Sequence, residues 1–118
     1  MEHDPDLKHR TKDFALRVVN LVNALPRDRT ADVIGRQLLR AGTSVGANYR
    51  AACRSRSAAE FVSRMTVVEE EADEAAYWME LLIEAGIMLE SRVSELLGEA
   101  NQLVAIMVPS IKTARNSK

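Results

Sequence analysis

Arginine is concentrated in the middle of this chain. Five arginines lie between residues 36 and 56: Arg36, Arg40, Arg50, Arg54 and Arg56. Arg36 and Arg50 are about four helical turns apart, so a helix through this region presents both on nearly the same side. Guanidinium groups suit phosphate oxygens because they donate paired hydrogen bonds. This basic stripe predicts contacts with RNA phosphates. A solvated helix face, or a match to acids on a neighbouring subunit, would give the same pattern.

Carboxylates form a second cluster, Glu-Glu-Glu-Ala-Asp-Glu, at residues 69–74. Glu71 and Glu74 have the spacing of the carboxylates that hold Mg²⁺ in all-α nucleotide pyrophosphatases, but such a site needs a second acidic pair on the next helix. From Glu84 onward, no glutamate has an acid three positions later. Di-iron bundles need Glu-x-x-His pairs, and the two histidines, His3 and His9, lie near the start of the chain. We therefore expect no catalytic residues, no metal site and no cofactor, and a metal-dependent nucleotide hydrolase is the least favoured function.

The composition favours helices. Aromatic residues make up 4% of the 118 residues. Apolar residues recur at helical spacing in four segments, which are predicted to be helices over residues 5–25, 31–53, 58–85 and 89–113. Long amphipathic helices joined by short loops are typical of an up-down-up-down four-helix bundle, an all-α fold. We expect residues 1–118 to form this single domain, with frayed tails at both ends.

Local signals mark the ends of these helices. Asp4 and Pro5 form a start signal, and Thr30 and Ser57 are predicted to cap the second and third helices. Glu60 lies three residues after Ser57 and completes a capping box. Three further residues are predicted to stop or bend helices: Pro26, Gly86 and Pro109.

The inward-facing seam of the second helix shows alternating four- and three-residue spacing. Its predicted members are Ile34, Leu38, Ala41, Val45, Asn48 and Ala52. A buried Asn48 needs a hydrogen-bond partner, and one buried amide can fix a single alignment of the helices. Ser44, one turn earlier, is placed to bond to Asn48 or to the backbone. Ser44 and Asn48 are therefore predicted as polar core residues rather than ligands.

Six apolar residues fall outside the predicted seams of the second and third helices: Leu39, Tyr49, Val67, Tyr77, Trp78 and Leu81. The outer face of a monomeric bundle is normally polar. An exposed apolar patch among charged neighbours often marks a contact between subunits. These six residues are predicted to lie in a homo-oligomer interface, with a wide core stripe as the alternative.

The charges of the chain are unevenly distributed. The net charge is −1, which argues against a strongly basic nucleic-acid binder. Residues 1–64 hold 12 Lys and Arg against 7 Asp and Glu, whereas residues 65–118 hold 4 against 10. Such halves indicate complementary surfaces within the chain, between copies or toward a partner.

Cysteine content and hydropathy bear on the compartment. Cys53 is the single cysteine, so no disulfide forms within the chain, which suits a reducing compartment. No apolar run approaches the ~18 residues that a membrane span needs. The N-terminus lacks the apolar core of a signal peptide. We expect a cytoplasmic protein without membrane contact, and an inert Cys53 thiol.

The segment between residues 40 and 61 resembles the core motif of a known family. The motif reads Arg40-Ala41-x-x-Ser44-Val45-x-x-Asn48, then Arg56-Ser57-x-x-Glu60-Phe61. It is similar to that of the four-helix-bundle proteins encoded in intervening sequences of bacterial 23S ribosomal RNA genes. Leu25-Pro26 and Gln37-Leu38 fit the same pattern, and the resemblance covers roughly residues 12–112. Ala51 stands where that family usually carries a glutamate.

The resemblance also implies partners. Members of this family resemble the accessory protein of diversity-generating retroelements, which assembles as a pentameric barrel and works with a reverse transcriptase and its template RNA. The resemblance therefore implies a non-catalytic pentameric scaffold or adaptor that binds RNA and a reverse transcriptase. A purely protein-binding module without nucleic-acid contact is the alternative. No small-molecule substrate is expected.

Overall fold

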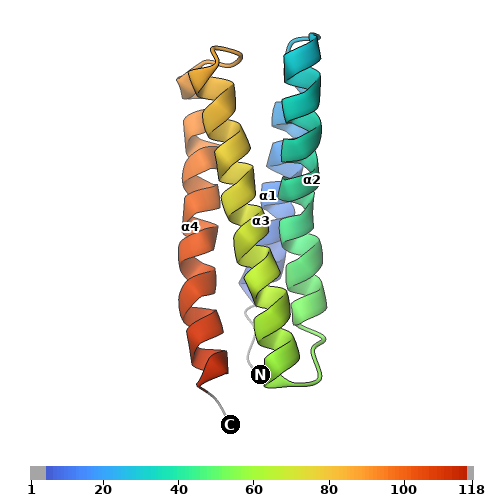
Figure 1. Ribbon diagram of the computed structural model, residues 1–118, viewed down its shortest axis with the longest axis vertical. Coiled ribbons are helices and arrows are strands. Elements are labelled where there is room, and N and C mark those ends of the chain that lie inside the picture. Colours follow the sequence, from blue (N-terminus) through green and yellow to red (C-terminus); the bar gives the residue numbers. More distant parts are fainter. Residues whose placement is uncertain (1–4, 117–118) are drawn as a thin grey trace.

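The computed structural model describes residues 5–116 and contains four α-helices in that range (Figure 1). They are α1 (Pro5–Asn23), α2 (Arg29–Ala52), α3 (Ala58–Glu84) and α4 (Glu90–Arg115). Each predicted boundary lies within two residues of the observed one. Asp4, predicted to start the first helix, lies outside the described residues, but Pro5 is the first residue of α1 as expected.

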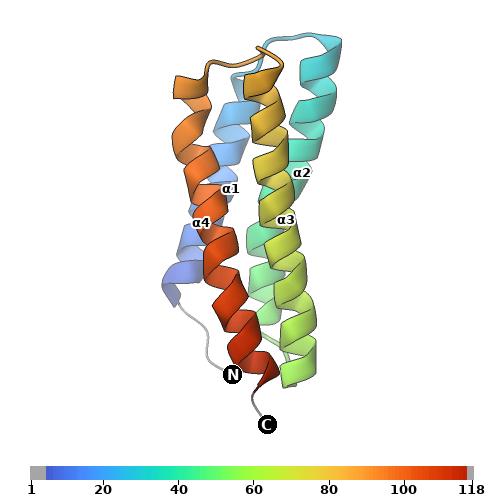
Figure 2. The same cartoon turned by 60° about the vertical axis from the view of Figure 1, so that its left-hand side comes forward.

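The helices run alternately up and down and form an elongated bundle of 50 × 20 × 19 Å (Figure 1). The expected all-α four-helix bundle is confirmed. Consecutive helices pack closely along their lengths, and the shorter α1 makes sparser contacts with α4 (Figure 2). The bundle is therefore tightest around α2 and α3 and most open between its first and last helices.

Side-chain caps mark the start of α2 and of α3. The N-cap of α2 is Asp28, whose carboxylate accepts a hydrogen bond of 2.8 Å from the Ala31 backbone N–H. The prediction of Thr30 as this cap is wrong. A carboxylate at Asp28 caps the same turn and also interacts favourably with the positive end of the helix dipole. Ser57 caps α3 as predicted, and its hydroxyl accepts from the Glu60 N–H at 3.1 Å.

Gly86 and Pro109 affect their helices differently: Gly86 follows the end of α3, whereas Pro109 lies within α4. Gly86 adopts a φ of 73°, so it ends α3 in the left-handed conformation that favours glycine. Pro109 lies inside α4, and the helix continues beyond it to Arg115. The helix therefore does not stop at Pro109, and it extends into the region predicted to be a frayed tail.

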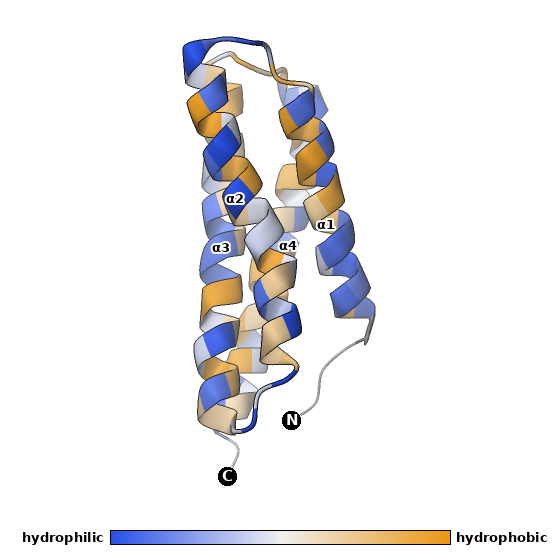
Figure 3. Cartoon of the chain, turned by 90° about the vertical axis from the view of Figure 1, so that its right-hand side faces the viewer, coloured by the Kyte–Doolittle hydropathy of each residue, from blue (hydrophilic) through white to orange (hydrophobic). Residues whose placement is uncertain are grey.

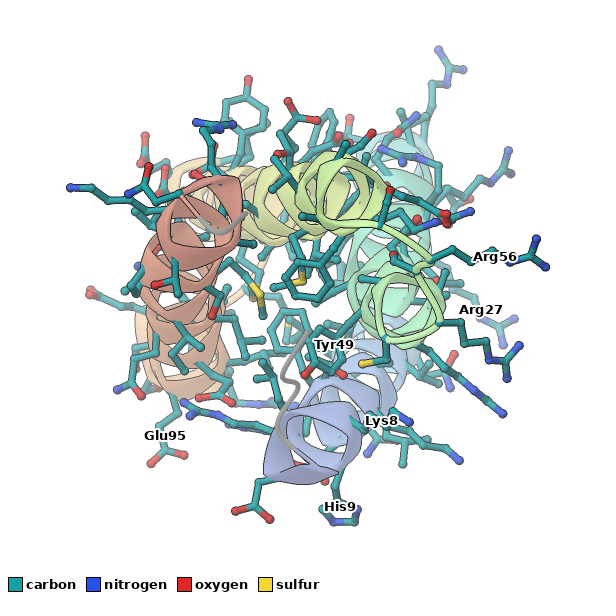
Figure 4. The ribbon with its side chains drawn as sticks, turned by 90° about the horizontal axis from the view of Figure 1, so that it is seen from below. Lys8, His9, Arg27, Tyr49, Arg56 and Glu95 are labelled. Carbon is teal, nitrogen blue, oxygen red and sulfur yellow. The ribbon has the colours of Figure 1, made fainter. Side chains whose placement is uncertain are left out.

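The core lies between all four helices. Its largest fully buried side chains include Phe14 of α1, Leu38 and Tyr49 of α2, Met65 of α3 and Leu103 of α4. Tyr49 is 1% exposed and points into the bundle (Figure 4).

The predicted seam of α2 is therefore wrong at one position, because Tyr49 occupies the place assigned to Asn48. The two residues are adjacent in the sequence, and Tyr49 is buried whereas Asn48 lies at the edge of the core. Burying a large aromatic ring stabilises the fold more than burying an amide does.

Two glycines let α1 approach α2 closely. A Cβ at Gly42 would lie 2.7 Å from Cγ2 of Val18, a residue with no exposed surface. A Cβ at Gly46 would lie 3.3 Å from the carbonyl carbon and oxygen of Thr11. Thr11 is itself buried and donates its hydroxyl to the Leu7 carbonyl at 2.8 Å. Small residues on α2 thus fix the separation of these two helices.

Within residues 5–116, no helix combines the length and apolar character that crossing a bilayer requires.

Candidate functional site

All five arginines of the predicted basic stripe are exposed, and four of them make no ion pair within residues 5–116: Arg36, Arg50, Arg54 and Arg56. Arg36, Arg50 and Arg54 are separated by 14 and 4 residues on or just beyond α2, so they share one side of that helix. Arg56 follows in the loop between α2 and α3. The structure thus keeps these four side chains available to a partner.

Arg40 does not belong with them. Its guanidinium turns toward α3, where Nη1 lies 3.1 Å from the Glu71 carboxylate and Nη2 pairs with Glu74. Glu74 also accepts a 2.9 Å hydrogen bond from the indole Nε1 of Trp78. Arg40 thus links α2 to α3, and its role in RNA binding stays a prediction, because its side chain is 49% exposed. The two acids considered for a metal site are the partners of Arg40 in this link.

A groove runs along the outside of α1 and α2, with a volume of about 590 Å³. We call it the basic groove, and it is lined by Lys8, His9, Lys12 and Ala15 of α1 and by Thr43, Gly46, Ala47 and Arg50 of α2. Lys8 lies on the side of α1 that faces α2, whereas His9 projects outward (Figure 4). The lower half of α1 is correspondingly hydrophilic in Figure 3. Three permanent cations and one histidine therefore line a single concavity.

The electrostatics of the basic groove are one-sided. The chain has 17 acidic and 16 basic residues, yet no acid among the described residues lines this groove. Within residues 5–116, neither Lys8, Lys12 nor Arg50 takes part in an ion pair. Like charges held close together raise the local potential and attract anions.

A second, smaller hollow extends the basic surface toward the α2–α3 loop. It is lined by Ala51, Arg54, Arg56, Glu60 and Arg64 and has a volume of about 400 Å³. Arg54 lies one turn beyond Arg50, so the two hollows follow each other along α2. Glu60 is the one acid among the lining residues of this hollow. Arg54 and Arg56 therefore continue the basic groove, whereas Arg36 lines neither hollow.

The sequence interpretation missed Lys8 and Lys12. A signal for them exists, because both fall on one side of the first predicted helix at four-residue spacing. In an antiparallel hairpin, the start of that helix lies beside the end of the next one, which carries Arg50. Combining helical spacing with the up-down topology would have brought these cations together.

The predicted interface residues fall into three groups. Tyr49 is buried in the core, so its assignment to an oligomer interface is wrong; its ring is part of the seam. Leu39, Trp78 and Leu81 are half-buried and pack against the core. Val67 and Tyr77 are 37% and 53% exposed, and Tyr77 stacks edge-on against Trp78 with ring centroids 5.1 Å apart.

The two predicted polar core residues lie at the edge of the core. Ser44 and Asn48 are half-buried, not fully buried as expected. The Ser44 hydroxyl donates to the Arg40 carbonyl at 2.7 Å, and Asn48 Nδ2 donates to the Ser44 carbonyl at 2.9 Å. Both bonds stay within α2, so these residues satisfy local backbone groups. Cys53 is a free, half-buried thiol.

The acids of α3 stay dispersed on the surface. Across residues 5–116, no three His, Cys, Asp or Glu side chains group as a set that could hold a metal ion. Glu70, Asp73, Glu80 and Glu84 are exposed on α3. They give this helix an acidic outer side, in contrast to the basic side of α1 and α2.

Comparison with known proteins places this bundle in a family. Residues 4–108 match the family described as 23S rRNA-intervening sequence protein. The chain belongs to this family. The expected resemblance is thereby confirmed for nearly the whole length of the bundle.

A solved member of the S23 ribosomal protein family supports the same assignment. It is a protein of unknown function from Bacteroides thetaiotaomicron VPI-5482, with 32% sequence identity and a TM-score of 0.83. The match covers 89% of this chain and 97% of that one. No curated protein matches.

Proposed function

We propose that this 23S rRNA-intervening sequence protein is a non-catalytic homo-oligomeric adaptor, a pentamer, that binds RNA and a reverse transcriptase. The observation that carries the RNA part is the basic groove with its extension through Arg54 and Arg56. It supplies unpaired cations on one side of a chain whose overall charge is −1. The resemblance of the family to the accessory protein of diversity-generating retroelements supports the oligomer and the reverse transcriptase. The absence of catalysis and a cytoplasmic location are parts of the same proposal.

An oligomer would compensate for the small number of cations on each subunit. A ring repeats the basic surface once per subunit, so weak phosphate contacts add through multivalency. RNA binding tests this directly by fluorescence anisotropy with a structured RNA at increasing salt. We expect affinity to fall steeply, because each phosphate that is neutralised releases counterions.

A charge-reversal pair identifies the surface that carries the binding. Replacing Arg36→Glu and Arg50→Glu should abolish binding, whereas Arg92→Glu with Arg115→Glu on α4 makes the same charge change away from the groove. Light scattering should show the same oligomer in both variants. Equal binding by the wild type and the Arg36/Arg50 variant would overturn the RNA assignment and leave the purely protein-binding alternative.

The oligomer has its own test at Tyr77. This side chain is half exposed and stacks on Trp78 at the surface, so Tyr77→Glu should leave the monomer folded. If the surface lies between subunits, the new carboxylate is buried without a partner and weakens assembly. Light scattering should then report a smaller mass for Tyr77→Glu than for Leu16→Glu, a matched change at a residue on α1 that is 57% exposed. A wild-type protein that is monomeric at tens of micromolar contradicts the proposal.

The reverse transcriptase as a partner is tested in two ways. The proposal expects a reverse transcriptase gene beside the gene for this chain. It also expects the immobilised oligomer to retain the reverse transcriptase that this neighbouring gene encodes. A neighbouring gene of another kind, with no retention, would remove this partner while leaving the RNA test unaffected.

A further inference from the structure

We propose that the basic groove between α1 and α2 holds consecutive backbone phosphates of an RNA strand and does not read the bases. Lys8, Lys12 and Arg50 bind the phosphate oxygens. This inference rests on the proposed RNA-binding function and adds the place, the contacted groups and the lack of sequence preference.

These three exposed cations make no ion pair within residues 5–116, in contrast to Arg10 and Arg40. Arg10 pairs with Glu99 at 2.7 Å, and Arg40 pairs with Glu71 and Glu74. Those two arginines are therefore committed to joining helices. Lys8, Lys12 and Arg50 instead line a concavity to which the described part of the chain contributes no acid, so their charges repel one another until an anion enters.

The two walls of the basic groove present cations to the same space. Lys8 and Lys12 are one turn apart on α1, with a rise of ~6 Å between their Cα atoms. Arg50 stands on the opposite wall, because α2 runs antiparallel to α1. A strand lying along the groove would thus meet ammonium groups on one side and a guanidinium fork on the other, both of which bind phosphate.

The floor of the basic groove leaves room for a backbone and offers nothing to a base. The small residues that line the groove are Ala15, Gly46 and Ala47, which we take as its floor, and the glycine lets the two helices approach at Thr11. No Phe, Tyr or Trp lines the groove, and the imidazole of His9 is the one ring among its lining residues. Stacking on a ring tolerates any base, so His9 would add no sequence preference. Tyr49, next to Arg50 in the sequence, is buried in the core. Contacts limited to phosphates fix a strand in place without specifying its sequence.

The acidic side of α3 on a second copy is the competing occupant. Its carboxylates sit on a helix with bulky exposed neighbours such as Tyr77. The small floor of the basic groove gives such a ring no matching apolar pocket, and a thin phosphodiester chain suits that floor better. The experiment below separates the two occupants.

Salt dependence in the lysine variant provides the test. The variant Lys8→Ala with Lys12→Ala is compared with Arg92→Ala with Lys112→Ala, which removes two charges from α4. Anisotropy is measured with oligouridine and oligoadenosine of equal length, and light scattering monitors the oligomer. The slope of log affinity against log salt should fall in the lysine variant by about 1.4 for each subunit that the oligonucleotide contacts, since each single-strand phosphate contact contributes about 0.7. The α4 variant should keep the wild-type slope.

Base independence has two further readouts. The wild type should bind the two homopolymers with closely similar affinity. Inorganic polyphosphate, a chain of phosphates without bases, should displace both. A strong preference for one homopolymer, or no displacement by polyphosphate, would overturn a site limited to phosphates.

The remaining outcomes separate this inference from the proposed function. If the wild type binds RNA and the lysine variant keeps the full slope, the groove assignment is wrong and the RNA-binding function stands. If the wild type binds no RNA at low salt, both fail. If the lysine variant loses its oligomeric mass, the groove is a contact between subunits and the phosphate site is overturned.

Discussion

Arg10 of α1 and Glu99 of α4 link the two neighbouring helices that make the sparsest contacts with each other. The Arg10 guanidinium donates from Nε at 2.7 Å and from Nη2 at 2.8 Å to the two carboxylate oxygens of Glu99. Nη2 also donates to Gln102 at 2.9 Å. This paired geometry is the strongest form of an ion pair between side chains. This ion pair therefore joins α1 to α4, where the packing between neighbouring helices is sparsest.

The pair makes stability depend on pH. Hydrogen bonding from Arg10 lowers the pKa of Glu99 below its ordinary value, and burial opposes this shift only in part. A carboxyl group whose pKa is lower in the folded state stabilises the fold above its unfolded pKa. That stabilisation is lost as the pH falls through the folded pKa. The bundle should therefore lose the contribution of this pair below about pH 4.

Removing the charge of Glu99 tests this link. Glu99→Gln should lower the free energy of unfolding by about 1 kcal/mol near neutral pH, a modest value because Arg10 is partly exposed. Urea denaturation should show the difference from the wild type shrinking at acidic pH, where the wild-type carboxylate is protonated. Glu95→Gln is the matched control, since Glu95 projects into solvent from the same helix (Figure 4). An equal loss in both variants at neutral pH would show that the pair adds nothing.

Two glycines should respond in opposite ways to alanine. Gly42→Ala places a Cβ within 2.8 Å of both γ-carbons of the buried Val18, whose branched side chain cannot turn away. We expect a loss of about 1–3 kcal/mol in the free energy of unfolding. Gly98→Ala on α4 meets no atom within 4 Å, so it should stabilise by about 0.5–1 kcal/mol through helix propensity. Thermal unfolding measures both, and a stable Gly42→Ala variant would contradict the close approach of α1 and α2.

Two substitutions at the start of α2 test whether Asp28 or Thr30 is its N-cap. Asp28→Ala removes the side chain that accepts from the Ala31 N–H and should cost about 1 kcal/mol of stability. Thr30→Ala alters an exposed residue in the first turn and should change stability by only a few tenths of a kcal/mol. Chemical denaturation of the two variants under the same conditions gives the comparison. The reverse order would restore Thr30 as the cap.

The sequence by itself determined the features that depend on a few neighbouring residues. The four helices, the cap at Ser57 and the left-handed Gly86 were predictable because each arises within about one helical turn. The motif between residues 40 and 61 likewise sufficed for the family. Thr30 shows the limit of such signals, since Asp28 two residues away had an equally suitable side chain.

Only the tertiary structure decided which side chains meet across helices. Asn48 and Tyr49 both border the seam, and the space between four helices selects the aromatic ring. Arg40 looked like part of a free stripe until α3 placed Glu71 and Glu74 beside it. Lys8 and Arg50 are far apart in the sequence and line one groove because α1 and α2 run antiparallel. Helical spacing defines the faces of each helix, and the packing of neighbouring helices determines which charges are neutralised and which remain available to a ligand.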